Sequence, residues 1–203
     1  MRSQPTNTGG LAAALRALVA CPVGAIGDAA HRPLRDAATA FPLPIDGPVS
    51  YLGFNARASY GANSYLLERA GGNWMIDAPR WNAGLAGALE ARGGVTTIFL
   101  THRDAPVAFD ECTVIPTPGH TRGHCVLHAG DYLFSGDHLA WDGAAGRLDA
   151  HRNVCWYDWP AQIRSVARLR DVPFRWLLPG HGERVRLERP AMAAAIDALV
   201  ARS

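Results

Sequence analysis

The sequence predicts an α/β protein in which short strands and helices form layers around one core. Short runs of β-branched and aromatic residues are followed by amphipathic segments of helical length, and this order occurs twice along the chain. The 21 glycines and 14 prolines supply the tight turns that many short elements require. With 48% hydrophobic residues, a chain of 203 residues can bury one core of ordinary size.

The N-terminal segment is expected to differ from the rest of the chain. Residues 10–19 are rich in alanine and leucine and predict a short helix, which Cys21-Pro22 would end. The remainder of residues 1–46 contains glycine and proline without strand alternation. We therefore expect residues 1–46 to be an appendage and linker, and residues 47–203 to be the main domain.

The next elements form the first sheet-and-helix group. We expect strands at residues 49–54, 64–68, 73–76 and 96–100. The second and third of these are separated by Ala70-Gly71-Gly72, which favours a hairpin. Residues 82–92 predict a helix that Gly93-Gly94 ends, and the run TTIFL at 96–100 predicts a buried strand.

The second half repeats this order. Strands are expected at residues 113–116, 125–128, 132–134 and 175–178. Helices are expected at residues 159–170 and 188–201, the latter with Pro190 in its first turn, where proline is tolerated.

Composition excludes several classes of partner. The net charge of +2 provides no field that would attract nucleic acid or an anionic membrane. No apolar run reaches the roughly 18 residues that span a bilayer, and Arg16 inside the N-terminal apolar stretch disfavours a signal peptide. The four cysteines contain no C-x-x-C pair. Reduced thiols in a cytoplasmic protein are therefore expected.

Four polar residues follow predicted strands, each in a short loop: His102, His120, Asp137 and His181. Three of them lie next to glycine, which allows the sharp turn that presents a side chain from a strand end. If these strand ends meet at one edge, imidazoles and a carboxylate converge. Those groups are ligands that zinc and iron accept.

Several short stretches carry a family resemblance. They are Ile98-Phe99-Leu100-Thr101-His102, Pro118-Gly119-His120-Thr121, Ser135-Gly136-Asp137 and Pro179-Gly180-His181-Gly182. In this order, between about residues 48 and 183, they resemble the metallo-β-lactamase superfamily. The resemblance implies a four-layer αββα sandwich of the metallo-β-lactamase type, with a metal at one sheet edge. It also implies a metal-activated water as the nucleophile.

The chain departs from the main motif of that family, H-x-H-x-D-H, which here reads His102-Arg103-Asp104-Ala105-Pro106-Val107. Asp104 stands at the second histidine position, while Pro106 and Val107 cannot bind metal. Only 18 positions separate His102 from His120, which implies a fold shortened in its first half.

The resemblance gives the expected ligand set as His102, Asp104, His120, Asp137 and His181. This set would hold one zinc or iron ion per chain, because the second site retains too few ligands. His102 and His120 with one carboxylate would also suit iron(II).

Other residues have open roles. His124 and His138 are candidates for a replacement ligand or for a partner that hydrogen-bonds a ligand. Cys155-Trp156-Tyr157, together with Trp159, are candidates for one wall of a pocket, although an aromatic patch more often belongs to the core. Cys21-Pro22-Val23-Gly24-Ala25-Ile26 is similar to the last cluster-binding turn of ferredoxins. A single cysteine cannot hold an iron–sulfur cluster, so none is expected.

Three hypotheses of function remain. The first is a metal-dependent hydrolase that acts on an ester, thioester, lactone or amide of a small molecule, with Asp104 or Asp137 transferring protons. The second is a catalytically impaired relative of such enzymes with a structural metal or none. The third is iron-dependent redox chemistry. A shortened sheet would also leave an exposed edge, which favours a homo-oligomer.

Overall fold

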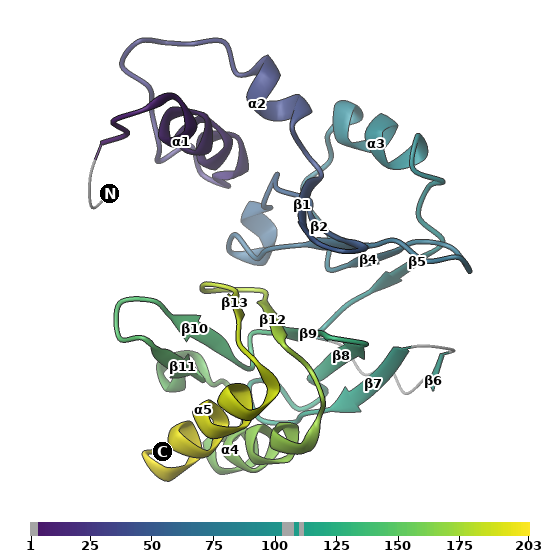
Figure 1. Ribbon diagram of the computed structural model, residues 1–203, viewed down its shortest axis with the longest axis vertical. Coiled ribbons are helices and arrows are strands. Elements are labelled where there is room, and N and C mark those ends of the chain that lie inside the picture. Colours follow the sequence, from purple (N-terminus) through teal and green to yellow (C-terminus); the bar gives the residue numbers. More distant parts are fainter. Residues whose placement is uncertain (1–3, 103–107, 110–111) are drawn as a thin grey trace. The chain divides into compact units, whose positions relative to one another are not determined.

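The computed structural model describes residues 4–102, 108–109 and 112–203, and the chain forms two compact units (Figure 1). Unit 1 comprises Met1–Phe99 and unit 2 comprises Leu100–Ser203. Each unit contains a β-sheet and helices, so the fold is of the expected α/β class. No helix within the described ranges has the length and apolar character needed to cross a membrane.

The sheet of unit 1 has its five strands in chain order. They are β1 (Leu43–Asp46), β2 (Val49–Tyr51), β3 (Tyr65–Leu67), β4 (Trp74–Ile76) and β5 (Thr97–Phe99). The first four strands pair antiparallel, and β5 joins β4 in parallel after the crossover through helix α3 (Ala83–Glu90). The predicted hairpin of β3 and β4 is confirmed. Within the predicted run 96–100 only Phe99 is buried, whereas Ile98 is 54% and Leu100 is 40% exposed, so the prediction of a buried strand is wrong.

Helices α1 (Thr8–Ala20) and α2 (Arg35–Thr39) and the short η1 (Arg57–Ser59) complete unit 1. The side chain of Asn7 caps α1 by accepting a hydrogen bond from the backbone N–H of Gly10 at 2.8 Å. Val19 and Phe41 belong to the same buried cluster as Leu52, Leu66 and Leu85. Part of the segment expected to be a linker therefore packs in the core of the sheet, and β1 lies inside that segment. The boundary at residue 46 stays a prediction.

One arginine ties α1 to the loops of unit 1. The guanidinium group of Arg80 donates hydrogen bonds to the carbonyl oxygens of Val19 at 2.6 Å and Cys21 at 3.0 Å. These carbonyls lie at the C-terminal end of α1, where the last carbonyls lack helical partners and a cation is favourable. The same guanidinium lies 5.6 Å from the ring centroid of Phe54.

The sheet of unit 2 has six strands in the order β13-β12-β9-β8-β7-β6. Their bounds are β6 (Ala108–Phe109), β7 (Cys112–Pro116), β8 (Cys125–Ala129), β9 (Tyr132–Gly136), β12 (Trp176–Pro179) and β13 (Val185–Arg186). Strand β8 pairs antiparallel with both β7 and β9, and β9 pairs in parallel with β12. Strands β7, β9 and β12 therefore run in the same direction, and their carboxyl ends lie at one edge of the sheet.

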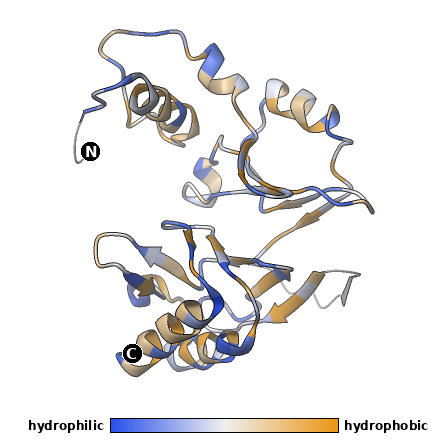
Figure 2. Ribbon diagram, viewed as in Figure 1, coloured by the Kyte–Doolittle hydropathy of each residue, from blue (hydrophilic) through white to orange (hydrophobic). Residues whose placement is uncertain are grey.

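Unit 2 also contains four helices and a hairpin. The helices are α4 (Trp159–Arg168), α5 (Arg189–Ala201) and the short η2 (Arg152–Val154) and η3 (Leu169–Asp171). The hairpin is formed by β10 (Ala140–Asp142) and β11 (Arg147–Asp149). Val166 from α4 and Ile196 from α5 pack in one cluster with Val126, Leu133 and Leu177 of the sheet. In Figure 2, α4 carries both hydrophobic and hydrophilic colours, as expected for a helix with one face on a core.

Most of the predicted helices and strands are present, with bounds that shift by a few residues. The sequence pattern missed α2, β1, β6, β13 and the β10–β11 hairpin, which are only two to five residues long. Such lengths are too short for a periodic pattern to appear.

Candidate metal centre

Three of the four polar strand-end residues come from strands that run in the same direction. His120 follows β7, Asp137 follows β9 directly, and His181 follows β12. Because these strands are parallel to one another, their carboxyl ends bring the three side chains to the same edge. His102 joins them through a hydrogen bond from the backbone N–H of Cys125 to the carbonyl oxygen of Thr101, 3.1 Å long.

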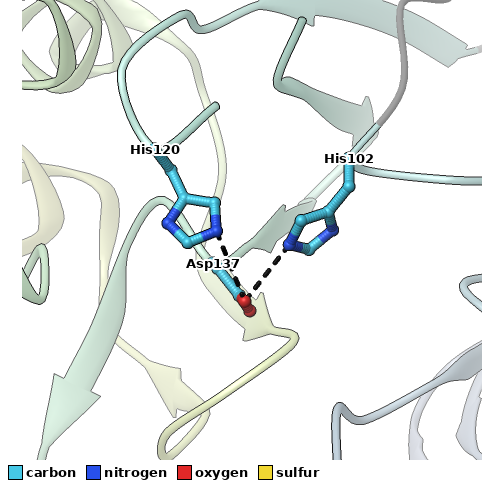
Figure 3. Close-up of side chains that lie close together, drawn as sticks. All are labelled: His102, His120 and Asp137. Atoms are coloured by element: carbon cyan, nitrogen blue, oxygen red, sulfur yellow. Dashed lines mark hydrogen bonds and ion pairs between the residues drawn. The ribbon is translucent and has the colours of Figure 1, made fainter. Parts of the chain in front are cut away.

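Asp137 lies at the centre of this edge (Figure 3). Its Oδ2 is 3.1 Å from Nε2 of His102 and 3.7 Å from Nε2 of His120. Its Oδ1 is 2.7 Å from Nδ1 of His181. The prospective ligand atoms of His102, His120 and Asp137 all lie within 4.8 Å of one another. One carboxylate is thus shared by three imidazoles, and two of these imidazoles form with it a group of metal-binding size.

The structure thus brings together four of the five residues in the expected ligand set. His181 contacts the centre through Asp137, and the compact group is formed by His102, His120 and Asp137. Asp104, the fifth member, lies outside the described residues, as do Pro106 and Val107. Its role as ligand or as proton-transferring group therefore stays a prediction.

The charge on Asp137 is strongly stabilised. Burial by itself would raise the pKa of this carboxyl group, but the hydrogen bonds from His102 and His181 outweigh burial and hold the pKa well below its usual range. The side chain is therefore an ionised acceptor. An ionised carboxylate is the form that binds a metal cation, and it accepts a proton only weakly.

His120 has the environment of a neutral metal ligand. Its side chain is only 1% exposed, and neither ring nitrogen makes a hydrogen bond with a described residue. Burial is the main cause that lowers the pKa of His120 below its usual value, so the ring is uncharged near neutral pH. Buried polar atoms without partners are costly, and a metal ion bound to Nε2 would satisfy one of them. The residues present therefore fit a metal ion.

Two further histidines pack against this group. The ring centroid of His124 is 5.6 Å from that of His102 and 5.9 Å from that of His120. Nδ1 of His124 is 2.9 Å from the hydroxyl of Thr117, which orients the ring. His138 stacks on His124 at 5.0 Å, and burial lowers the pKa of His138 to about 3. Both rings are thus neutral near pH 7, and whether His124 supports a ligand or replaces one stays a prediction.

Glycines at two loops allow this packing. Gly136 has φ +52, and a Cβ there would lie 2.6 Å from the Thr101 hydroxyl and 2.8 Å from Nε2 of His124. Gly119 has φ +151, and a Cβ there would overlap the backbone of Gln162 in α4. A side chain at either position would displace the residues that carry the histidines.

The loop between β11 and α4 contains aromatic residues for which the sequence allowed two assignments, a pocket wall or the core. The backbone N–H of Trp156 donates to the carbonyl oxygen of His120 at 3.1 Å. Trp156 and Tyr157 are 67% and 55% exposed, so assigning them to the core is wrong.

No protein-family model matches the chain, and no curated protein matches it either. The chain does match solved structures. The chain is similar to a metallo-β-lactamase from Erythrobacter litoralis with 15% sequence identity and a TM-score of 0.50, over 79% of this chain and 91% of that one. It is also similar to the protein TTHA1623, solved in a di-iron-bound form, with 21% identity and a TM-score of 0.51, over 76% of this chain and 98% of that one.

These similarities agree with what the sequence and the structure show separately. Two sheets with their helices occur in succession, and the polar strand ends of the second sheet meet at one edge. The chain has the metallo-β-lactamase fold.

Proposed function

We propose that the protein is a metal-dependent hydrolase that acts on an ester, thioester, lactone or amide bond of a small molecule and uses one zinc or iron ion. The observation that carries this proposal is the group of His102, His120 and Asp137, in which two imidazoles lie beside one ionised carboxylate. A metal bound there would polarise the substrate carbonyl and lower the pKa of a water molecule toward neutrality.

The protein's own residues would hold and orient this centre. His102 and His120 offer Nε2, and Asp137 offers Oδ2. The hydroxyl of Thr101 lies 2.9 Å from Nδ1 of His102, which fixes the direction of that ring. His181 bonds the other oxygen of Asp137, so the carboxylate cannot rotate freely.

Proton transfer is better assigned to Asp104 than to Asp137. Asp137 already accepts hydrogen bonds from two imidazoles, and its depressed pKa makes it a weak proton acceptor. Asp104 is two residues from His102 in the sequence and is the remaining carboxylate of the expected set. Replacing Asp104 with Asn should therefore lower kcat more than it lowers metal content.

The identity of the metal has two candidates. Three protein ligands with open positions are typical of catalytic zinc, and two histidines with one carboxylate also suit iron(II). The similarity to a protein solved in a di-iron-bound form supports testing for iron.

A second candidate function is a catalytically impaired protein that retains the metal for stability. Pro106 and Val107 favour it, because they occupy the positions where the resembling family has an Asp-His pair of ligands. In that case removal of the metal would lower the free energy of unfolding, and no substrate would be turned over.

Elemental analysis of the purified protein tests the proposal, with His120→Ala as the variant and His128→Ala as the matched control. The ring of His128 bonds the carbonyl oxygen of Gly130 at 2.8 Å in the β8–β9 turn and takes no part in the centre. We expect about one zinc or iron ion per chain in the wild type and in His128→Ala, and none in His120→Ala.

Activity on a panel of esters, thioesters and lactones should follow the metal content. Turnover in the wild type and its loss in a folded His120→Ala protein would support the hydrolase. Metal without turnover, together with a lower unfolding temperature of His120→Ala, would support the second candidate. A folded wild-type protein that binds neither zinc nor iron would contradict the hydrolase and would support the catalytically impaired relative without a metal.

A further inference from the structure

An exposed aromatic side chain lies beside the metal centre, on the loop that leads into α4, and a second exposed aromatic residue follows it in the sequence. The ring centroid of Trp156 is 5.0 Å from that of His120, and the two planes are inclined by 36°. We propose that Trp156, with Tyr157 next to it, binds an aryl or bulky alkyl group attached to the scissile carbonyl of the substrate. This inference rests on the proposed hydrolase function, whose substrate class it narrows.

The exposure of these side chains is the first argument. Trp156 is 67% exposed, Tyr157 is 55% exposed and Val154 is 38% exposed. A single exposed apolar residue on a surface is ordinary, whereas here three occur within four consecutive positions. Cys155 completes this stretch, so residues 154–157 contain no Asp, Glu, Lys, Arg or His. This stretch therefore suits an apolar group.

The loop is held in place, which is the second argument. The backbone N–H of Trp156 donates to the carbonyl oxygen of His120, and that of Asp158 donates to the carbonyl oxygen of Gly119 at 3.0 Å. The thiol of Cys155 lies 3.2 Å from the same Gly119 oxygen. Three contacts thus tie the loop to the segment that carries His120. A fixed aromatic ring loses little conformational entropy when it binds a ligand.

The charged side chains that flank this stretch in the sequence, Arg152 and Asp158, are already engaged, which is the third argument. The guanidinium group of Arg152 lies over the ring of Trp159, 5.5 Å from its centroid. The carboxylate of Asp158 caps α4 by accepting a hydrogen bond from the backbone N–H of Ala161 at 2.6 Å. The face of Trp156 is therefore the main feature that this loop offers to a ligand. Contact between two aromatic rings corresponds to roughly a two- to tenfold gain in affinity beyond the burial of area.

Kinetics with two thioesters that share a leaving group test the proposal. Trp156→Ala should lower kcat/KM for a phenylacetyl thioester about five- to tenfold, mainly through KM, and should change kcat/KM for the acetyl thioester less than about twofold. Trp156→Phe retains an aromatic face and should restore most of the difference. An equal loss for both thioesters would mean that Trp156 only positions His120, and would overturn the proposal.

Equilibrium binding separates this inference from the proposed function. Calorimetry would measure the binding of phenylacetate and of acetate to the metal-containing wild-type protein and to Trp156→Ala protein of equal metal content. Phenylacetate binding that weakens in the variant, while acetate binding does not, would support the aromatic surface even if no substrate were turned over. Phenylacetate binding that is equal in both proteins would overturn it, even if hydrolysis were observed.

Discussion

The buried amide side chains of unit 1 and two buried imidazoles of unit 2 differ in their hydrogen bonding. In unit 1 the buried amides are fully used: the side chain of Asn73 bonds the carbonyl oxygens of Arg92 and Gly94 and the backbone N–H of Arg69. In unit 2 the buried imidazoles of His120 and His138 make no hydrogen bond through either ring nitrogen to a described residue.

This difference distinguishes side chains that stabilise the fold from side chains that are available to bind a ligand. A side chain whose donors and acceptors are all satisfied stabilises the fold. A buried group without partners costs stability, and it is retained where a ligand completes it. Substitutions of equal size in the two units should therefore have different consequences, with stability changing in unit 1 and metal binding changing in unit 2.

Asn73→Ala should produce the largest change in stability. Asn73 is 6% exposed, and its removal leaves two carbonyl oxygens and one N–H without their partner. We expect the free energy of unfolding in urea to fall by about 2–3 kcal/mol, with metal content per folded chain unchanged. Asn153→Ala, at an exposed position, is the matched control and should stay within about 0.5 kcal/mol of the wild type. A loss of metal in folded Asn73→Ala protein would contradict the expectation that substitutions in unit 1 change stability and not metal binding.

The pH dependence of stability should identify the buried imidazoles of unit 2. The pKa of His138 is lowered to about 3, so the unfolded chain binds a proton at this residue that the folded chain does not bind between about pH 3 and the ordinary pKa of histidine near 6.5. Stability of the metal-free protein should therefore fall as pH is lowered from 6.5 to 5.

His138→Phe removes this contribution, and the slope of unfolding free energy against pH should decrease by about 1.4 kcal/mol per pH unit at most. Urea denaturation at several pH values measures it. Asp137 has a depressed pKa and should lose its stabilising effect only as the pH falls below about 4, outside this window. An unchanged slope in His138→Phe would show that His138 is charged in the folded protein.

The smallest effects should come from two helix caps, one in each unit. Asn82 accepts a hydrogen bond from the backbone N–H of Leu85 in α3, and Asp158 accepts one from that of Ala161 in α4. Replacing either with Ala should cost about 1 kcal/mol of stability. Only Asp158→Ala should also weaken metal affinity, because loss of this cap loosens the turn whose backbone N–H, retained in the variant, bonds the carbonyl oxygen of Gly119 next to His120. Equal metal affinity in both variants, measured by competition with a chelator, would contradict the distinction.

The longer elements and the candidate site were predicted from different signals in the sequence. Helices α1, α4 and α5 have enough length for a periodic pattern, and the hairpin of β3 and β4 has glycines in its turn. The strand-end positions of His120, Asp137 and His181 were informative because parallel strands bring their carboxyl ends to one edge.

Other features depend on contacts that no local pattern contains. The neutral state of His138 arises from burial and from the nearby His120, and not from its sequence neighbours. The link from Arg80 to Val19 joins residues 61 positions apart. The exposure of Trp156 follows from hydrogen bonds between its loop and the segment around His120, whereas tryptophan in a sequence is more often expected in a core.

The close packing around Gly136 has a consequence for how the chain can vary. Any side chain there would meet Thr101 and His124, and the positive φ adds strain to every residue except glycine. By contrast, nothing lies within 4 Å of a Cβ built at Gly71 or Gly87. In a randomised library selected for metal retention, codons at positions 71 and 87 should diversify, while position 136 should return glycine in nearly every survivor.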